Sequence, residues 1–227
     1  HIYLAETIPF PFVRDTKKYG ARIQFHGKTI ADAAANMKQE MKEDWFDLST
    51  LKEPFRVEGK KTLGYELAEQ SDWSLPDVII YPTGGGTGLI GMWKAFKEMM
   101  QLGWITGQLP RMVAVQSDGC APVVDAFLHN ASSTQFWENS NTAALGLNVP
   151  GPLGGPWMLR VLYESNGTAL CVKEQELESA TQEIKRVSGI NTSQEGGAVW
   201  GAFQTLVAEG WIKKGETTVL FMTGKER

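Results

Sequence analysis

The sequence predicts an α/β protein with parallel, twisted sheets that carry helices on both faces. Short apolar segments alternate with helix-forming segments along all 227 residues, which is typical of strand–helix–strand units with parallel strands. The composition, with 42% hydrophobic and 21% charged residues, is that of an ordinary folded domain. A run of glycines also separates an apolar segment from a helical one, and ligands of parallel sheets bind at such carboxyl ends of strands.

The individual elements follow from the spacing of apolar residues. Short continuous apolar runs predict strands at 2–5, 21–25, 78–81, 112–116, 169–172 and 218–221. Apolar residues recurring at helical spacing predict helices at 12–19, 29–41, 60–70, after the glycine run, and at 121–129, 157–164, 174–187 and 196–209. Two connections are expected to be irregular because of their Ser, Asn, Pro and Gly content, at 130–141 and 148–156.

A domain boundary is expected near Trp45–Pro54, where a charged helix ends and Pro54 forces an extended backbone. The chain begins at His1 rather than Met and continues directly into the apolar segment Ile2–Ala5. We therefore expect it to be the later part of a longer polypeptide.

Charge and composition disfavour several partners. The net charge is −4, from 22 basic and 26 acidic residues without a basic run, so nucleic acid is not expected as a partner. No apolar run reaches the length of a membrane span. Cys120 and Cys171 lie far apart, and neither they nor the histidines have metal-ligand spacing. We expect a cytoplasmic protein without a metal site.

The strongest functional motif is the run of glycines after the apolar segment Val78–Tyr81. Glycines allow the backbone to approach a ligand closely, and the following helix presents amide groups and a favourable dipole to an anion. The motif therefore predicts a phosphate site. Two alternatives remain at this point: a tight turn without a ligand, or a dinucleotide fingerprint at Gly86–Gly91 with Asp118 as the ribose-binding acid.

Other candidates are ambiguous in isolation. Arg56 opens a charged segment that could be a solvated helix turn or, together with Ser49, Thr50 and Lys52, an anion site. Thr223 ends the last predicted strand, where a hydroxyl faces the ligand edge or forms a simple turn. Cys120 is expected to be a buried residue at a helix start, and Glu195 a carboxylate near a helix cap.

In this order, the motifs resemble those of threonine synthases of the pyridoxal-phosphate fold type II group, in a bacterial form. The specific part is "LSTLKEPFRVEGKKT" (48–62) followed by "YPTGGGTGLIGMWKAF" (81–96). Supporting segments are "PRMVAVQSDGCAP", "YESNGTAL", "EGGAVWGAF" and "VLFMTG". The resemblance implies a tryptophan-synthase-β-like fold, with residues 1–52 in part of a small mobile domain and 53–227 in a large cofactor-binding domain.

The resemblance also assigns roles to residues. It implies that backbone amides of the glycine loop hold the phosphate of pyridoxal 5′-phosphate and that Thr223 hydrogen-bonds the pyridine nitrogen. It implies that Arg56 binds the substrate phosphate, with Ser49 or Thr50 as hydroxyl partners. The cofactor-binding residues are thus Gly84, Gly85, Gly86, Thr87, Gly88 and Thr223.

The implied reaction converts O-phospho-L-homoserine and water to L-threonine and phosphate, through a Schiff-base lysine. In the family, that lysine precedes the region matching His1, and Lys60 and Lys61 do not correspond to it. We therefore expect no catalytic lysine in this chain and expect the chain alone to be inactive. The family includes monomers and dimers, so a homodimer is one expected state. The alternatives are a threonine or serine dehydratase of the same fold, an NAD-dependent oxidoreductase, and a non-catalytic remnant.

Overall fold

The computed structural model describes residues 1–225, which form two compact units. The first comprises His1–Leu48, and the second begins at Ser49. The sequence placed the boundary a few residues later, between 52 and 53. The assignment of the two parts to a small mobile and a large cofactor-binding domain remains a prediction.

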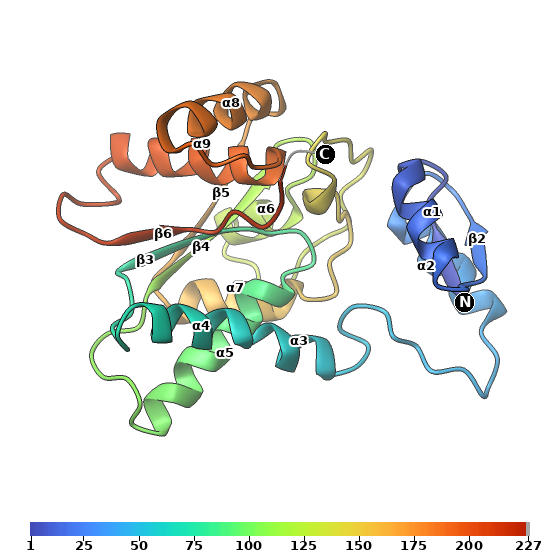
Figure 1. The fold of residues 1–227 in the computed structure, drawn as a ribbon, viewed down its shortest axis with the longest axis horizontal. Helices are drawn as coiled ribbons and strands as arrows, with labels where there is room; N and C mark the ends of the chain where they lie inside the picture. The colour runs from blue at the N-terminus through green and yellow to red at the C-terminus, as the bar shows by residue number, and fades with distance from the viewer. Residues whose placement is uncertain (226–227) are drawn as a thin grey trace. The chain divides into compact units, whose positions relative to one another are not determined.

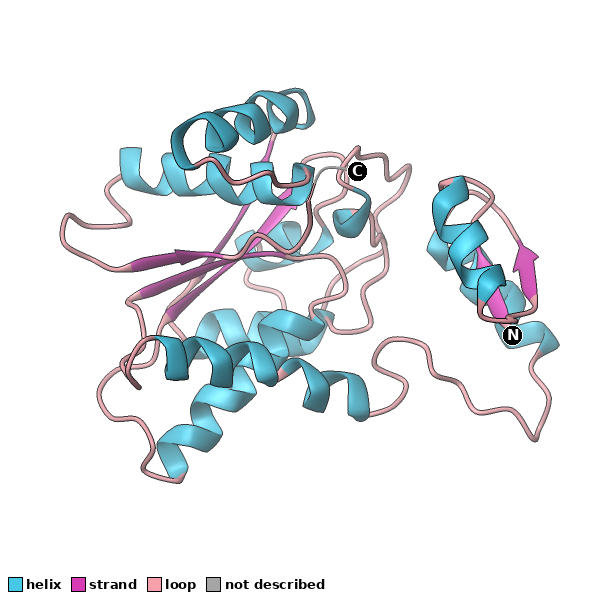
Figure 2. Ribbon diagram, in the orientation of Figure 1, coloured by secondary structure: helices cyan, strands magenta, loops and turns pink. Residues whose placement is uncertain are grey.

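The first unit contains two parallel strands and two helices (Figures 1 and 2). Its elements are β1 (Ile2–Leu4), α1 (Phe10–Lys18), β2 (Ile23–Phe25) and α2 (Ile30–Glu40). Helix α2 begins with a capping box: the Thr29 hydroxyl accepts the Asp32 amide at 3.2 Å, and the Asp32 carboxylate accepts the Thr29 amide at 2.8 Å. Two apolar side chains of this unit are buried, Val13 and Ala33.

The second unit is a four-stranded parallel sheet between layers of helices (Figures 1 and 2). The spatial order of its strands is β5-β4-β3-β6. The strands are β3 (Val78–Pro82), β4 (Arg111–Ser117), β5 (Thr168–Val172) and β6 (Thr218–Leu220). The helices are α3 (Phe55–Lys60), α4 (Thr62–Gln70), α5 (Thr87–Gln101), α6 (Pro122–Leu128), α7 (Gly155–Glu164), α8 (Leu177–Ser188) and α9 (Gln194–Ala208), with 3₁₀ turns η1 (Leu145–Leu147) and η2 (Glu174–Glu176). This arrangement confirms the predicted α/β class.

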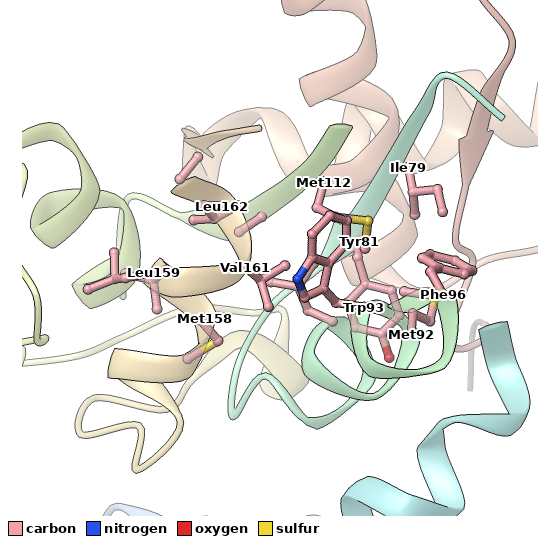
Figure 3. Packing of buried hydrophobic residues seen from close by; sticks show 14 of the residues in the cluster. Ile79, Tyr81, Met92, Trp93, Phe96, Met112, Met158, Leu159, Val161 and Leu162 are labelled. Carbon is pink, nitrogen blue, oxygen red and sulfur yellow. The ribbon is translucent and has the colours of Figure 1, made fainter. Parts of the chain in front are cut away.

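The alternation of side chains along β3 and β4 gives the second unit two cores. Ile79 and Tyr81 pack with α5 and α7 on one face (Figure 3), whereas Val78 and Ile80 pack with α9 on the other. Because both faces are covered, every residue of β3 is buried. The continuous apolar sequence of this strand is the direct consequence.

The helices divide between the two faces according to the direction of the crossovers. From β3 to β4 and from β4 to β5 the chain steps in one direction, and α5 and α7 cover one face (Figure 1). From β5 to β6 the chain returns in the opposite direction, and α8 and α9 cover the other face. This division is required when all parallel crossovers have the same hand.

Helix α3 begins earlier than the sequence predicted. The predicted helix started at Lys60, but the structure is already helical from Phe55, and Lys61 keeps helical angles (φ −59°, ψ −27°) between α3 and α4. The segment containing Arg56 is therefore a helix turn rather than a connection leading to one. Among residues 1–225, none of the helices is both long and apolar enough to cross a membrane.

Candidate functional site

The glycine loop connects β3 to α5 at the carboxyl edge of the sheet. Thr83 starts it in a fixed position, because its amide donates to the Val115 carbonyl at 2.8 Å and its hydroxyl to the Tyr81 carbonyl at 2.8 Å. Gly86 then turns the chain with a left-handed conformation (φ 83°), and α5 begins at Thr87. Such a turn favours glycine, which has no Cβ to clash with the backbone.

The loop leaves a row of amide groups available to a ligand. Within residues 1–225, no acceptor receives a hydrogen bond from the amides of 84–89. The first intrahelical bond of α5 is from the Ile90 amide to the Gly86 carbonyl, at 3.0 Å. Consecutive amides at the N-terminus of a 15-residue helix favour an anion through both hydrogen bonding and the helix dipole. The residues present therefore fit a phosphate group.

Packing explains most of the loop glycines. A Cβ at Gly84 would lie 2.2 Å from the Gly146 carbonyl oxygen, and one at Gly88 would lie 2.0 Å from the Tyr81 hydroxyl. At Gly86 the Sδ of Met158 would be 2.1 Å away. Gly85 differs, because a Cβ there would make only an ordinary contact, 3.7 Å from Cγ2 of Thr50.

The segment before α3 supplies a side chain to the open part of the loop. Thr50 lies beside Gly85, since its Cγ2 would be 3.7 Å from a Cβ at that glycine. Leu51, the next residue, has a left-handed backbone (φ 65°), which is unfavourable for a bulky side chain. Its Cδ1 packs against Gly154, where a Cβ would be only 2.8 Å from it. The structure thus brings Thr50 to the glycine loop from a distant part of the sequence.

A second segment, 145–149, covers the other side of the loop. It contacts Gly84 through the Gly146 carbonyl and Val149. The Glu195 carboxylate, in the first turn of α9, accepts the Gly146 amide at 2.7 Å. Glu195 therefore lies near a helix start, as the sequence indicated. Its hydrogen bond with Gly146 also joins α9 to the segment 145–149.

Thr223 lies just beyond β6 and is exposed. Strand β6 pairs with β3 through Ile80 and Leu220, and the Phe221 amide donates to the Ile80 carbonyl at 3.1 Å. Because parallel neighbours end at the same edge of a sheet, Thr223 and the glycine loop lie on the same edge. The Gly224 carbonyl, which follows, accepts the Ser193 amide at 3.1 Å.

Arg56 is held in the first turn of α3 by a buried carboxylate. The Glu53 side chain is only 4% exposed, accepts the Arg56 amide at 3.2 Å, and lies 3.7 Å from the guanidinium Nε. The Arg56 side chain itself is half-exposed. A buried acid beside a partly exposed arginine fixes the direction of the guanidinium.

Lys61 and Lys94 form an ion-pair network between α3, α4 and α5. Lys61 lies 2.7 Å from Glu58 and 2.6 Å from Glu98, and Lys94 contacts the same two acids. Hydrogen bonds to Glu58 and Glu98 raise the pKa of Lys61. A lysine that stays protonated is a poor nucleophile, so these ion pairs disfavour a covalent role for Lys61.

Asp118 and Cys120, two other candidates from the sequence, are held in contacts of the fold itself. One carboxylate oxygen of Asp118 accepts the Glu174 amide at 2.8 Å, so this acid is engaged in a loop contact. The Cys120 thiol is fully buried, and burial raises its pKa. Buried, protonated thiols are inert, as expected from the sequence. Across residues 1–225, no group of His, Cys, Asp and Glu side chains could hold a metal ion.

Sequence reasoning missed Gln116, which contacts the start of the loop, and Glu174, which joins the end of β4 to the segment at Ala143. Gln116 is fully buried, and its side-chain amide donates to the Thr83 carbonyl at 3.0 Å. Glu174 accepts hydrogen bonds from the Ser117 hydroxyl and the Ala143 amide. Neither residue belongs to a local motif, because its partners come from other loops.

Comparison with protein families gives a match over nearly the whole chain. A family model described as pyridoxal-phosphate dependent enzyme matches residues 1–224. Among curated relatives, the threonine synthase of Methanocaldococcus jannaschii is 32% identical over 206 residues, which cover 91% of this chain and 51% of that protein. The threonine synthase of Methanosarcina acetivorans gives the same identity and coverage. The chain thus spans about half the length of the curated relatives it matches.

Solved structures with the same fold have lower identity. An L-serine ammonia-lyase from Rhizomucor miehei aligns with a TM-score of 0.81 at 15% identity, over 98% of this chain and 69% of that one. The processed form of threonine deaminase isoform 2 from Solanum lycopersicum aligns with a TM-score of 0.70 at 19% identity, over 99% and 62%. At these identities the likeness establishes the fold alone.

Proposed function

The chain belongs to the family of pyridoxal-phosphate dependent enzymes, and from this premise we propose that the loop Gly84–Gly88 binds the phosphate of pyridoxal 5′-phosphate. The observation that carries the proposal is the row of unpartnered amides at the N-terminus of α5. Hydrogen bonds from these amides and the helix dipole would both stabilise the dianion. Residues 84–88 carry no charged side chain, which suits a phosphate that is held by backbone amides.

Thr223 is proposed to hold the pyridine nitrogen. It lies at the same edge of the sheet as the loop and is exposed, so its hydroxyl is accessible to a ligand. A hydroxyl, unlike a carboxylate, does not stabilise a protonated nitrogen. When bound, the cofactor supplies an electron sink for negative charge that develops on the substrate carbon, and Thr223 would keep that sink moderate.

The finer proposal is a threonine synthase reaction on O-phospho-L-homoserine. It is supported by the 32% identity to two threonine synthases and by the position of Thr50 beside Gly85. Arg56, oriented by Glu53, would bind the substrate phosphate, with Ser49 or Thr50 as the hydroxyl partner. The products would be L-threonine and inorganic phosphate.

The catalytic lysine is proposed to lie in a segment preceding the region that matches His1, as in the threonine synthases that the sequence resembles. The reaction is therefore assigned to a protein that contains both parts. A cytoplasmic location and a homodimeric state are further expectations of this proposal, and neither is needed for the chemistry of the site.

Product analysis distinguishes the proposed reaction from that of a dehydratase. The full-length protein, loaded with pyridoxal 5′-phosphate, should release phosphate and L-threonine from O-phospho-L-homoserine. Ammonia and a keto acid from threonine or serine, without phosphate release from O-phospho-L-homoserine, would instead establish a dehydratase. Tight binding of NAD without binding of pyridoxal 5′-phosphate would exclude both and support an oxidoreductase.

A further inference from the structure

Gln116 connects the glycine loop to the start of helix α6. Its side-chain amide donates to the Thr83 carbonyl at 3.0 Å, and its side-chain oxygen accepts the amides of Val123 and Val124 at 2.8 and 3.2 Å. The side chain is fully buried. A primary amide both donates and accepts, so it can satisfy a loop carbonyl and a helix N-terminus together.

The Thr83 carbonyl is the last backbone group before the row of open amides. The amide and the hydroxyl of Thr83 already donate hydrogen bonds to the carbonyls of Val115 and Tyr81. The bond from Gln116 fixes the remaining polar group of Thr83 and so restricts the peptide plane that carries the Gly84 amide. The protein's own hydrogen bonds thus restrain the peptide at which the loop begins.

We propose that Gln116 is a positioning residue for the phosphate loop, acting through Thr83 without touching the ligand. This inference rests on the proposed binding of the cofactor phosphate by Gly84–Gly88. A loop whose amides are already oriented does not lose that conformational freedom on binding. Removing the Gln116 contact should therefore weaken binding of the phosphate group specifically.

Ser165, which directly follows α7, provides a matched control that contacts the same strand. Its hydroxyl accepts the Met112 amide at 3.2 Å and donates to the Leu162 carbonyl at 3.3 Å, and the residue is buried. Like Gln116, it links β4 to a helix, but it lies at the opposite, amino end of the strand. Ser165→Ala should lower stability without changing the loop.

The test measures binding of pyridoxine 5′-phosphate and of pyridoxine to the 227-residue chain. Both compounds lack the aldehyde, so neither can react with lysines, and they differ by the phosphate. In Gln116→Met, the affinity for pyridoxine 5′-phosphate should fall about tenfold or more, as expected when buried hydrogen-bond partners are left unpaired. The affinity for pyridoxine should be unchanged, and Ser165→Ala should bind both compounds as the parent chain does.

Hydrogen exchange provides a second readout. Exchange in Gln116→Met should rise at the Val123 and Val124 amides, which lose their acceptor, and Ser165→Ala should not reproduce that pattern. If Gln116→Met does not fold, Gln116→Glu is measured at alkaline pH, because burial favours the neutral acid, which can donate to Thr83, and only the ionised carboxylate accepts the α6 amides without donating.

The outcomes separate the two proposals. If the parent chain shows no preference for the phosphorylated compound, the proposed phosphate site is wrong. If the parent chain prefers it and the Gln116 variants keep that preference, the positioning role is wrong while the phosphate site stands. Loss of the preference in the Gln116 variants, with Ser165→Ala unchanged, supports both.

Discussion

At the scale of single residues, the glycines of the loop differ in whether a larger side chain would fit and in what excludes it. Gly84 and Gly88 leave no room for a Cβ because a backbone oxygen or a buried tyrosine occupies that space. Gly86 also adopts a left-handed conformation. Gly85 has neither restriction, and it is the glycine beside Thr50. The sequence shows the run, but only the packing shows which positions tolerate a methyl group.

This difference predicts that two similar substitutions change the free energy of unfolding by different amounts. Gly88→Ala should lower the free energy of unfolding by about 1–3 kcal/mol, the usual cost of overpacking, because Tyr81 must move. Gly85→Ala should change it by less than about 0.5 kcal/mol. Urea unfolding of the two variants compares them directly, and equal losses would contradict the packing argument.

Glu174 is a residue-scale source of pH dependence. Burial raises the pKa of its carboxyl, but hydrogen bonds from the Ala143 amide and the Ser117 and Thr142 hydroxyls outweigh burial, so the pKa lies below its ordinary value of 4.5. A group with a lowered pKa in the folded state contributes stability above its unfolded pKa. That contribution disappears as the pH falls through the folded pKa.

We therefore expect Glu174→Gln to be more destabilising at neutral than at acid pH. The loss should be about 1 kcal/mol at pH 7, typical of hydrogen bonds to a charged group after partial replacement by an amide, and should shrink as the pH is lowered below 4.5. Urea unfolding at several pH values measures this trend. Glu209→Gln, at an exposed position, serves as the control, and a pH-independent loss at Glu174 would disprove the interpretation.

The residues of the candidate site could be predicted from sequence only where they form local patterns. The glycine loop is such a pattern, since glycines, strand and helix are consecutive. Gln116 and the Glu195–Gly146 bond are not, because each joins segments far apart in the chain. A glutamine inside a strand carries no signal of the loop it supports.

At the scale of elements, apolar spacing located nearly every strand and helix to within a few residues. The exception is α3, which begins after Pro54 and in whose sequence, FRVEGK, half of the residues are charged. Its stability comes from contacts outside the helix: Lys60 and Val57 pack against Gly91 of α5, and Glu58 pairs with Lys61 and Lys94. Such tertiary support is invisible to a local pattern.

Helix α2 offers an element-scale prediction, because a capping box fixes its start. Thr29→Ala removes the hydroxyl that accepts the Asp32 amide and should destabilise the helix by about 1 kcal/mol. Hydrogen exchange in residues 30–36 should become faster. Thr16→Ala is the control, since the Thr16 hydroxyl donates to the Phe12 carbonyl within α1 and caps no helix. Similar effects of both changes would argue against the cap.

At the scale of the whole molecule, the alternation of elements predicts parallel strands but not their spatial order. The order β5-β4-β3-β6 depends on the return of the chain across the opposite face after β5. No local residue pattern marks that return, because it depends on which strand edge β6 finally pairs with. The return nevertheless makes β6, which precedes Thr223, the neighbour of β3, the strand that carries the glycine loop.

A covalent labelling experiment tests the expectation about the catalytic lysine. Borohydride reduction of the 227-residue chain with pyridoxal 5′-phosphate, followed by peptide mapping, should label no single lysine stoichiometrically. Lys61 and Lys94 are held in ion pairs, and the resemblance described above predicts no catalytic lysine in this chain. A stoichiometric adduct on one lysine would contradict this expectation.

The pairing of β3 with β6 also has a consequence for the order of folding. Val78 pairs with Thr218, and the adjoining bond between Asp77 and Thr217 spans 140 residues. During synthesis, β4 can join one edge of β3 soon after it emerges, whereas the other edge stays unpaired until β6 leaves the ribosome. Contacts of such long sequence separation form slowly, and an open strand edge invites association with other chains. We therefore expect β3, the strand that carries the glycine loop, to keep an unpaired edge on the nascent chain until β6 has emerged.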